Sequence, residues 1–222
     1  YDLDDVIPTR IATALGLPVF HPGIIMEGGS VDFNGAGTVM TSKSCLLNPN
    51  RNPHLNQDQI EKYLSDYYGI DQVLWVSDGI VGDDTDGHID DTVRFVNEDT
   101  VITVVEPNVL SANHEILQQN LKELKQMRLL SGKQLNIVEL PMPAEVIYEG
   151  QALPASYANF YISNGHIIVP TFKCDADDKA MQIIQSCFTT REVVGIDSTD
   201  IIWGLGSFHC LSQQEPSIVN KV

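Results

Sequence analysis

The sequence lacks a long apolar run and contains few basic residues. No stretch approaches the roughly 20 consecutive apolar residues of a membrane-spanning helix, so we expect no membrane partner. Only 13 of the 222 residues are Lys or Arg, against 30 Asp and Glu, which gives a formal net charge of −17. This excess of acids argues against nucleic acid as a partner and suits a cationic ligand, although acidic residues also serve solubility alone.

Cysteine is also scarce, and its spacing excludes several kinds of site. The four cysteines are Cys45, Cys174, Cys187 and Cys210, and they form no Cys-x-x-Cys pair and no dense framework. Reduced thiols in a cytoplasmic protein are therefore expected, and no signal peptide is visible from Tyr1 onward. Cys45 in an apolar, strand-like run and Cys187 in a helical pattern are predicted to be core residues.

One pattern recurs along the chain: two β-rich runs, a helical pattern and a further β-rich run. Hydrophobic residues make up 43% of the sequence, enough for a substantial core. The three copies lie near 38–76, 91–140 and 158–196, and Asn164-Gly165 in the third is a strong hairpin signal. We therefore predict a single α/β domain over 1–222, built of three ββαβ units around a common axis.

The element boundaries follow from apolar periodicity and turn residues. A short helix at 4–16, with Gly16 as its C-cap, and a strand at 17–20 are expected before the repeats. The strands expected within the repeats are 38–41, 44–47, 72–76, 91–96, 101–105, 135–140, 158–163, 166–169 and 192–196, and the helices are 57–68, 112–129 and 175–188.

Five residues suited to chemistry occupy similar places in these units. Glu27 comes just before the first predicted hairpin, and His88 and Asp90 come just before the second. Asn159 begins the third, and Cys210 follows its closing strand in a Gly-rich run. Because equivalent positions of rotationally arranged units converge on their axis, we expect these side chains to form one site.

The motifs around these residues resemble the guanidino-group-modifying superfamily, whose pentein fold is an α/β-propeller of five ββαβ blades. The motifs are Glu27-Gly28-Gly29, Asp86-Gly87-His88-Ile89-Asp90, Ala155-Ser-Tyr-Ala-Asn159-Phe-Tyr, and His209-Cys210 with Gln213-Gln214-Glu215-Pro216. Within the superfamily, residues 1–222 look most like agmatine deiminase and the bacterial peptidyl-arginine deiminase.

The resemblance also implies that blades are missing. Members of the family carry two further blades before these three, with an additional guanidinium-binding Asp that Asp2, Asp4 and Asp5 do not match. The sequence is therefore expected to correspond to the C-terminal three-fifths of such an enzyme. An incomplete ring exposes strand edges, so a homo-oligomer or an upstream segment is expected to cover them.

For catalysis, the resemblance implies hydrolytic deimination through a covalent intermediate. Cys210, as thiolate, would attack the guanidinium carbon and form an S-alkylthiouronium. His88 would protonate the departing ammonia and then activate water, for which its ordinary pKa of about 6.5 is suitable. Asp90 would bind two guanidinium N–H groups in a fork. Glu27 would be a buried acid in contact with the substrate or with His88.

Three further residues are expected on the substrate side of the site: Asp84, Gly28 and Asn159. Plain structural roles stay open for several candidates. His88 suits an exposed loop, Cys210 a small core residue and Asn159 a strand-edge polar group. Asp91 is expected to be an ordinary acid at a strand start.

No metal and no cofactor are predicted. The acidic loop Asp83–Asp91 lacks the ligand spacing of a calcium-binding EF-hand. His88, His209 and Cys210 lack a zinc-ligand pattern. The glycines at 204 and 206 do not continue into a nucleotide-binding motif.

The leading hypothesis is an enzyme that converts agmatine to N-carbamoylputrescine and ammonia, in the formation of putrescine. Acids near the site suit the amine of agmatine, whereas an arginine carboxylate would require cations. Two alternatives remain: a deiminase of peptidyl-arginine or of another guanidino compound, and an inactive fragment with a binding or structural role.

Overall fold

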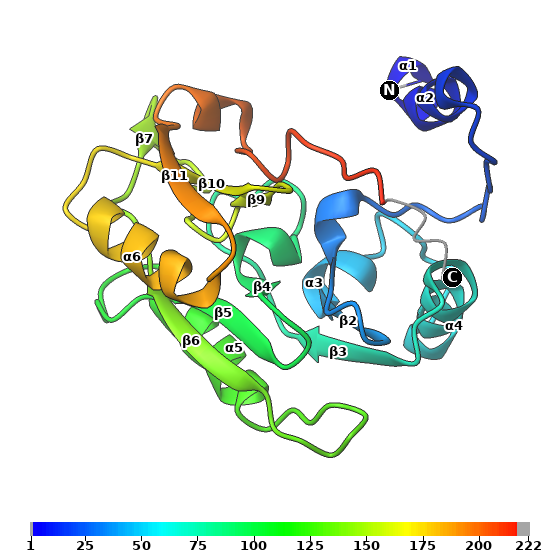
Figure 1. The fold of residues 1–222 in the computed structure, drawn as a ribbon, viewed down its shortest axis with the longest axis horizontal. Helices are drawn as coiled ribbons and strands as arrows, with labels where there is room; N and C mark the ends of the chain where they lie inside the picture. Colours follow the sequence, from blue (N-terminus) through cyan, green and yellow to red (C-terminus); the bar gives the residue numbers. More distant parts are fainter. Residues whose placement is uncertain (1, 217–222) are drawn as a thin grey trace.

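The computed structural model describes residues 2–216, and its strands form three similar sheets. The first blade contains β1 (Val31–Phe33), β2 (Thr38–Ser42), α4 (Gln57–Tyr68) and β3 (Gln72–Val76). The second contains β4 (Val93–Phe95), β5 (Thr100–Val105), α5 (His114–Leu124) and β6 (Asn136–Pro141). The third contains β9 (Tyr161–Ile162), β10 (His166–Thr171), α6 (Asp177–Cys187) and β11 (Glu192–Asp197). Figure 1 shows the blades following one another around the molecule.

Shorter elements connect the blades or precede them. They are α1 (Asp2–Asp5), α2 (Ile7–Leu15), α3 (Lys43–Leu46), the 3-10 turns η1 (Gly28–Ser30), η2 (Ile89–Asp91) and η3 (Ile201–Gly204), and the hairpin of β7 (Ile147–Tyr148) and β8 (Gln151–Ala152). Among residues 2–216, no helix has the length and apolar character needed to cross a membrane.

The three blades share one topology, which confirms the predicted ββαβ repeat. In each, the first two strands pair antiparallel, as β1 with β2, β4 with β5 and β9 with β10. A helix then crosses over to a third strand that runs parallel to the second, as in β2–β3, β5–β6 and β10–β11. Crossovers of this kind suit parallel pairs because the helix covers one face of the sheet.

The predicted boundaries of the first blade are wrong at its hairpin. The hairpin pairs 31–33 with 38–42, whereas residues 44–47, expected as a strand, belong largely to α3. Ser42 causes the change, because its side chain caps α3 by accepting a hydrogen bond from the backbone N–H of Cys45 at 3.3 Å. Residues 17–20 form no strand, and α5 ends at Leu124 rather than near 129.

Neighbouring blades share their hydrophobic cores. Ile102 and Leu117 of the second blade belong to the same buried cluster as Ile167 and Ile184 of the third. A second cluster combines Met40 of the first blade with residues of the second. The blades therefore support one another, as expected for units too small to bury their own faces.

A buried arginine joins all three blades near their inner strands. Arg94 of β4 donates from Nε to Asp32 Oδ1 of β1 at 2.8 Å, and from Nη1 to the carbonyls of Ala158 and Phe160 at 3.0 and 2.8 Å. Its guanidinium carbon also lies 4.8 Å from the centre of the Phe160 ring. Each hydrogen bond to a charged group is worth about 1.5–3 kcal/mol.

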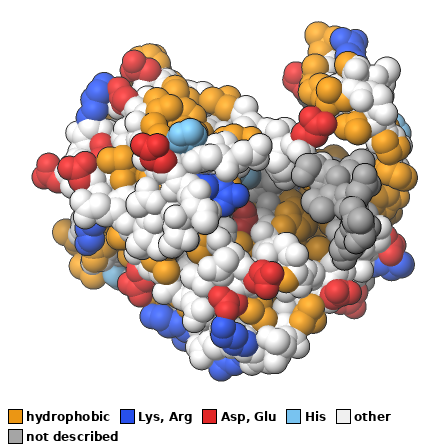
Figure 2. All heavy atoms as spheres, viewed as in Figure 1, with side chains coloured by type: hydrophobic (Ala, Val, Ile, Leu, Met, Phe, Trp, Pro, Cys, Tyr) orange, Lys and Arg blue, Asp and Glu red, His pale blue; other side chains and the backbone are white. Residues whose placement is uncertain are grey.

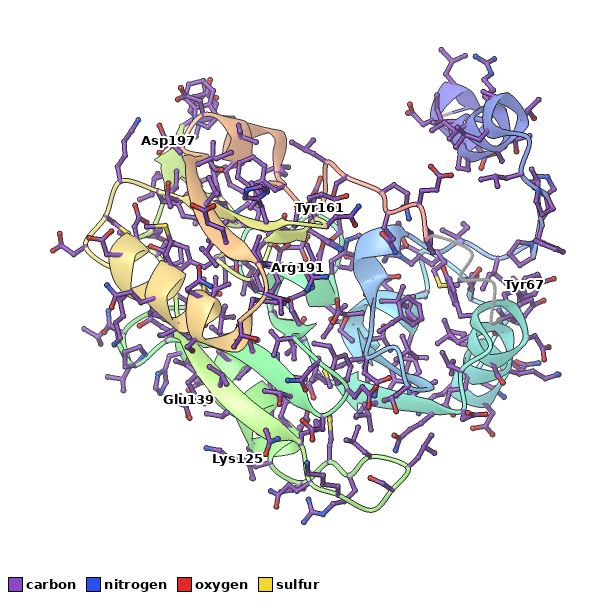
Figure 3. All side chains as sticks on the ribbon, viewed as in Figure 1. Tyr67, Lys125, Glu139, Tyr161, Arg191 and Asp197 are labelled. Carbon is purple, nitrogen blue, oxygen red and sulfur yellow. The ribbon has the colours of Figure 1, made fainter. Side chains whose placement is uncertain are left out.

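Asp32, Arg94 and Tyr161 hold the same position in the three blades. Each lies opposite the third residue of its blade's second strand in the hairpin register. Tyr161 lies near the middle of the molecule in Figure 3. The repeat therefore brings three different side chains to the same central region.

The N-terminal helix α2 extends away from the blades. Gly16 ends it in the left-handed conformation (φ 68°), as predicted. None of its residues is buried, and Ile7, Ile11 and Leu15 are exposed at helical spacing. Figure 1 shows this segment projecting from the blades, and Figure 2 shows hydrophobic atoms on its surface.

We predict that Arg94→Met destabilises the fold strongly. The substitution leaves the Asp32 carboxylate buried without its cation, and breaking a buried ion pair typically costs about 3–5 kcal/mol. Denaturant unfolding measures the loss. Lys133→Met is the control, because Lys133 pairs with Asp99 on the surface, where both side chains are substantially exposed. A loss no larger than that of the control would show that Arg94 does not hold the blades together.

Candidate active site

A cleft of about 760 Å³ lies where the first strands of the three blades meet. Residues of β1, β4 and β9 line it, together with the segment that follows η3. Six of the predicted site residues line this cleft: Glu27, Gly28, Asp84, His88, Asp90 and Cys210. The seventh, Asn159, is buried behind Cys210.

The repeat explains how Glu27 and His88 reach the same cleft. Glu27 immediately precedes the turn η1, which leads into the first blade. His88 immediately precedes η2, which leads into the second blade. Both residues therefore stand at the same position relative to their blades, as the sequence pattern predicts.

Asn159 holds the backbone and the sulfur of Cys210. Its Oδ1 accepts hydrogen bonds from the backbone N–H groups of His209 at 3.0 Å and Cys210 at 3.3 Å, and from Ser207 Oγ. Its Nδ2 donates to Cys210 Sγ at 3.0 Å and to Asp91 Oδ1 at 2.9 Å. Since Asn159 is itself fully buried, one fixed amide determines where the thiol lies.

Asp90 and Asp91 are adjacent buried acids whose pKa values shift in opposite directions. Burial opposes ionisation of Asp90, but the hydrogen bond and charge of His209, with the charges of Arg94 and His88, lower its pKa below the ordinary value. For Asp91, burial and the negative charge of Asp90 raise the pKa well above the ordinary value. The negative charge of the pair is therefore favoured on Asp90.

Two buried polar atoms at the cleft have no hydrogen-bond partner among residues 2–216. They are Asp90 Oδ1 and His88 Nε2. Asp90 Oδ2, by contrast, accepts from His209 Nδ1 at 2.6 Å. The predicted fork from Asp90 to a guanidinium uses both carboxylate oxygens. Oδ1 is free to accept a hydrogen bond, whereas Oδ2 would have to accept a second one. Buried polar atoms are nearly always paired, so these two atoms are the cleft groups with hydrogen-bonding capacity left to use.

Cys210 is exposed to the cleft, but its sulfur contacts buried polar groups. Sγ lies 3.5 Å from Asp90 Oδ2 as well as 3.0 Å from Asn159. Burial of the sulfur, followed by the negative charges of Asp90 and Asp91, raises the pKa of the Cys210 thiol. A nearby cation would oppose this effect and favour the thiolate.

Glu27 is not the buried acid that the sequence predicts. Its side chain is 38% exposed, and its partner is Arg51, whose Nε lies 2.8 and 3.0 Å from the two carboxylate oxygens. Glu27 nevertheless stays close to His88, because ligand atoms of Glu27, His88 and Cys45 lie within 4.8 Å of one another. Cys45, predicted in a strand, is a buried residue of α3, and burial raises its pKa to about 12.

Sequence reasoning missed the structural roles of Arg51, His209, Asp91 and Arg94. His209 and Asp91 are next to predicted site residues in the sequence, and this adjacency could have indicated that they belong to the site. Asp91, expected as an ordinary acid at a strand start, is instead buried behind the thiol. No local pattern around Arg51 or Arg94 indicates that either forms a long-range ion pair.

Two groups of donors are close enough to consider as metal ligands. Glu27, Cys45 and His88 form one group, and Asp90, Asp91 and Cys210 form the other. In the first group, the Arg51 guanidinium occupies Glu27 and would repel a cation. In the second, Asp90 pairs with His209. These contacts give no support to a resident metal.

Comparisons with known proteins agree in sequence and structure. The profile of the Porphyromonas-type peptidyl-arginine deiminase family matches residues 1–216. The "Putative agmatine deiminase" of Legionella pneumophila (strain Paris) is 36% identical over 215 residues, which are 96% of this chain and 62% of that protein. This chain thus spans less than two thirds of the length of that curated relative.

Solved structures of similar proteins superpose closely. The agmatine deiminase of Enterococcus faecalis gives a TM-score of 0.93 at 31% identity, over 99% of this chain and 65% of that one. An agmatine deiminase of C. jejuni with substrate bound gives 0.87 at 34% identity, over 94% of this chain and 61% of that one.

The blades and the cleft define the class of protein. It is the pentein-type α/β-propeller of the guanidino-group-modifying proteins, of which three ββαβ blades are present in residues 2–216. The chain belongs to the Porphyromonas-type peptidyl-arginine deiminase family.

We predict that Asp90→Asn makes Cys210 more reactive toward iodoacetamide. Removing the charge of Asp90 lowers the thiol pKa, and each unit increases the thiolate fraction about tenfold while the thiol form predominates. In the unaltered protein, the alkylation rate should still rise with pH above 9, because the Cys210 pKa is raised from an ordinary value of 9.0. Peptide mass spectrometry after timed alkylation measures the rate, with Cys187 as internal reference. A rate at pH 7.5 that is unchanged or lower in the variant would contradict the assigned charge effect.

Proposed function

We propose that this chain carries the catalytic site of an agmatine deiminase, which hydrolyses agmatine to N-carbamoylputrescine and ammonia. The observation that supports it most directly is one acid-lined cleft containing a fixed thiol, an ionised carboxylate with a free oxygen, and a histidine with an unpaired nitrogen. Proteins named agmatine deiminase share both the sequence pattern and the fold. Activity, substrate and mechanism are proposals for the whole protein.

The chemistry divides into two steps at the guanidinium carbon. In the first, Cys210 loses its thiol proton to solvent, its sulfur bonds to the carbon, protonated His88 gives a proton to one amino group, and the C–N bond breaks to release ammonia. In the second, His88 takes a proton from water, whose oxygen bonds to the same carbon and displaces the Cys210 thiolate. The product loses its remaining proton to solvent and is a neutral urea, so one water is consumed for each ammonia released.

The charge of the substrate is part of this mechanism. Without a ligand, burial and the neighbouring acids raise the pKa of Cys210 and keep it a thiol. A guanidinium placed at Asp90 Oδ1 brings a positive charge close to the sulfur and lowers its pKa. The nucleophile would therefore form mainly when a cationic substrate is present.

The lining of the cleft favours agmatine over free arginine. Arg94 is the single Lys or Arg among the described residues that line the cleft, and its hydrogen bonds to Asp32 and two carbonyls already occupy it. Glu27, Asp84 and Asp90 also line the cleft. These charges suit a second cationic group on the ligand, such as an amine, better than a carboxylate.

A second candidate substrate is peptidyl-arginine, which the name of the matched family supports. Its backbone carries no free carboxylate at an internal arginine, so the acidic lining does not disfavour it. Ammonia release from agmatine, free arginine and an internal-arginine peptide distinguishes the three. We propose agmatine as the substrate with the highest kcat/KM.

We further propose a cytoplasmic location and a part in putrescine formation. All four cysteines are free, which is consistent with a reducing compartment.

We predict that Cys210→Ser abolishes ammonia release from agmatine, since a hydroxyl has neither the acidity nor the nucleophilicity of a thiol. Stopping the reaction of the unaltered protein with acid should reveal a covalent adduct on Cys210 by mass spectrometry. If residues precede Tyr1 in the natural protein, the longer protein is assayed beside this chain. Normal turnover by Cys210→Ser would exclude the proposed nucleophile.

We predict that Gly29→Ala lowers kcat/KM for agmatine by about a hundredfold or more, because misplacement of a catalytic group by about 1 Å costs that much. A Cβ at Gly29 would lie 2.5 Å from His88 Nδ1 and 2.8 Å from Asp90 Oδ2, so both side chains must move. Gly165→Ala is the matched control, because no atom lies within 4 Å of its Cβ position. Equal kinetics of the two variants would show that the site tolerates displacement of His88 and Asp90.

A further inference from the structure

Arg51 is a buried cation at the edge of the site that the proposed chemistry leaves unused. It is 8% exposed and lies outside the cleft lining. Its Nε and Nη2 contact the Glu27 carboxylate, Nη2 also donates to the carbonyl of Thr85 at 2.6 Å, and Nη1 donates to Asp86 Oδ2 at 2.9 Å. One guanidinium thus joins the segment of Glu27 to the loop that precedes His88.

That loop adopts a demanding backbone conformation. Asp86 and Gly87 both have positive φ, 62° and 97°, and the first of these is unfavourable for a residue with a side chain. The Asp83 carboxylate stabilises the turn by accepting hydrogen bonds from the backbone N–H groups of Gly87 at 3.0 Å and His88 at 2.9 Å. Arg51 braces it from outside, where Asn50 also donates to Asp86 at 2.6 Å.

The same guanidinium also holds an acid that lies close to His88. Ligand atoms of Glu27, His88 and Cys45 lie within 4.8 Å of one another. Because Arg51 Nε contacts both carboxylate oxygens of Glu27, it fixes the acid beside the imidazole as well as the turn that carries the imidazole.

We propose that Arg51 is a positioning residue for deimination, which fixes Glu27 and the turn that carries His88. The assignment rests on the proposed function. It extends that function to a side chain outside the cleft that acts through Glu27 and His88. The role depends on the planar fork of the guanidinium, which reaches Glu27, Thr85 and Asp86 at once.

Two substitutions test this role. Arg51→Gln removes the fork, so we expect kcat for agmatine to fall about a hundredfold while KM changes little, because the residues that line the cleft are unaltered. Arg51→Lys keeps the charge but cannot hold Glu27, Thr85 and Asp86 together, so its kcat should fall in the same way. Arg128→Gln is the control, because this exposed arginine donates only to nearby backbone carbonyls.

Amide hydrogen exchange at Gly87 and His88, measured by NMR, tests the positioning independently of turnover, because both amides are hydrogen-bonded within the turn. We expect faster exchange in Arg51→Gln and Arg51→Lys than in the unaltered protein, and no change in Arg128→Gln. Unchanged exchange in both Arg51 variants, or kcat within twofold of the original in both, overturns the positioning role. If the unaltered protein does not release ammonia, the proposed function fails while the exchange rates still decide whether Arg51 holds the turn.

Discussion

The ion pair of Arg94 with Asp32 is the interaction on which the arrangement of the blades depends. Three ββαβ units bring chemically different side chains to one equivalent position, and Arg94 connects its own blade to an acid on one neighbour and to backbone carbonyls on the other. These contacts lie at the inner strands, which also line the cleft. The contacts that join the blades therefore also determine how far apart the side chains that line the cleft lie.

The site combines several acids with few free cations, and its ionisation states follow from that imbalance. His209 compensates Asp90 and lets it ionise, whereas Asp91 has no cation of its own and is pushed toward the neutral form. The thiol of Cys210 responds to the same field, because thiolate formation would add another negative charge beside Asp90. A cation bound beside Asp90 would relieve this repulsion, so in the proposed reaction the charge of the substrate would favour the thiolate.

The sequence allowed the repeat and most of the cleft residues to be predicted, because both depend on local patterns. Apolar alternation and the Asn164-Gly165 turn locate strands, and motif residues at equivalent places in the repeat identify the cleft. The first hairpin was misplaced because a single capping side chain, Ser42, turns an apolar run into a short helix. The partner of Glu27 was missed because Arg51 lies 24 residues away, in a polar connection without periodicity.

Asn159 shows that a buried residue outside the cleft can determine the position of a residue that lines it. Its amide is satisfied on both sides, since Oδ1 accepts two backbone N–H groups and a hydroxyl while Nδ2 donates to Cys210 and Asp91. A thiol held by such a group cannot turn away from the cleft without breaking buried hydrogen bonds, which is costly. Arg51 has a less direct relation to His88, because it contacts Glu27, Thr85 and Asp86 rather than the imidazole. Cys210 and the turn before His88 are thus each held by a buried residue outside the cleft lining, and the cleft itself can stay open.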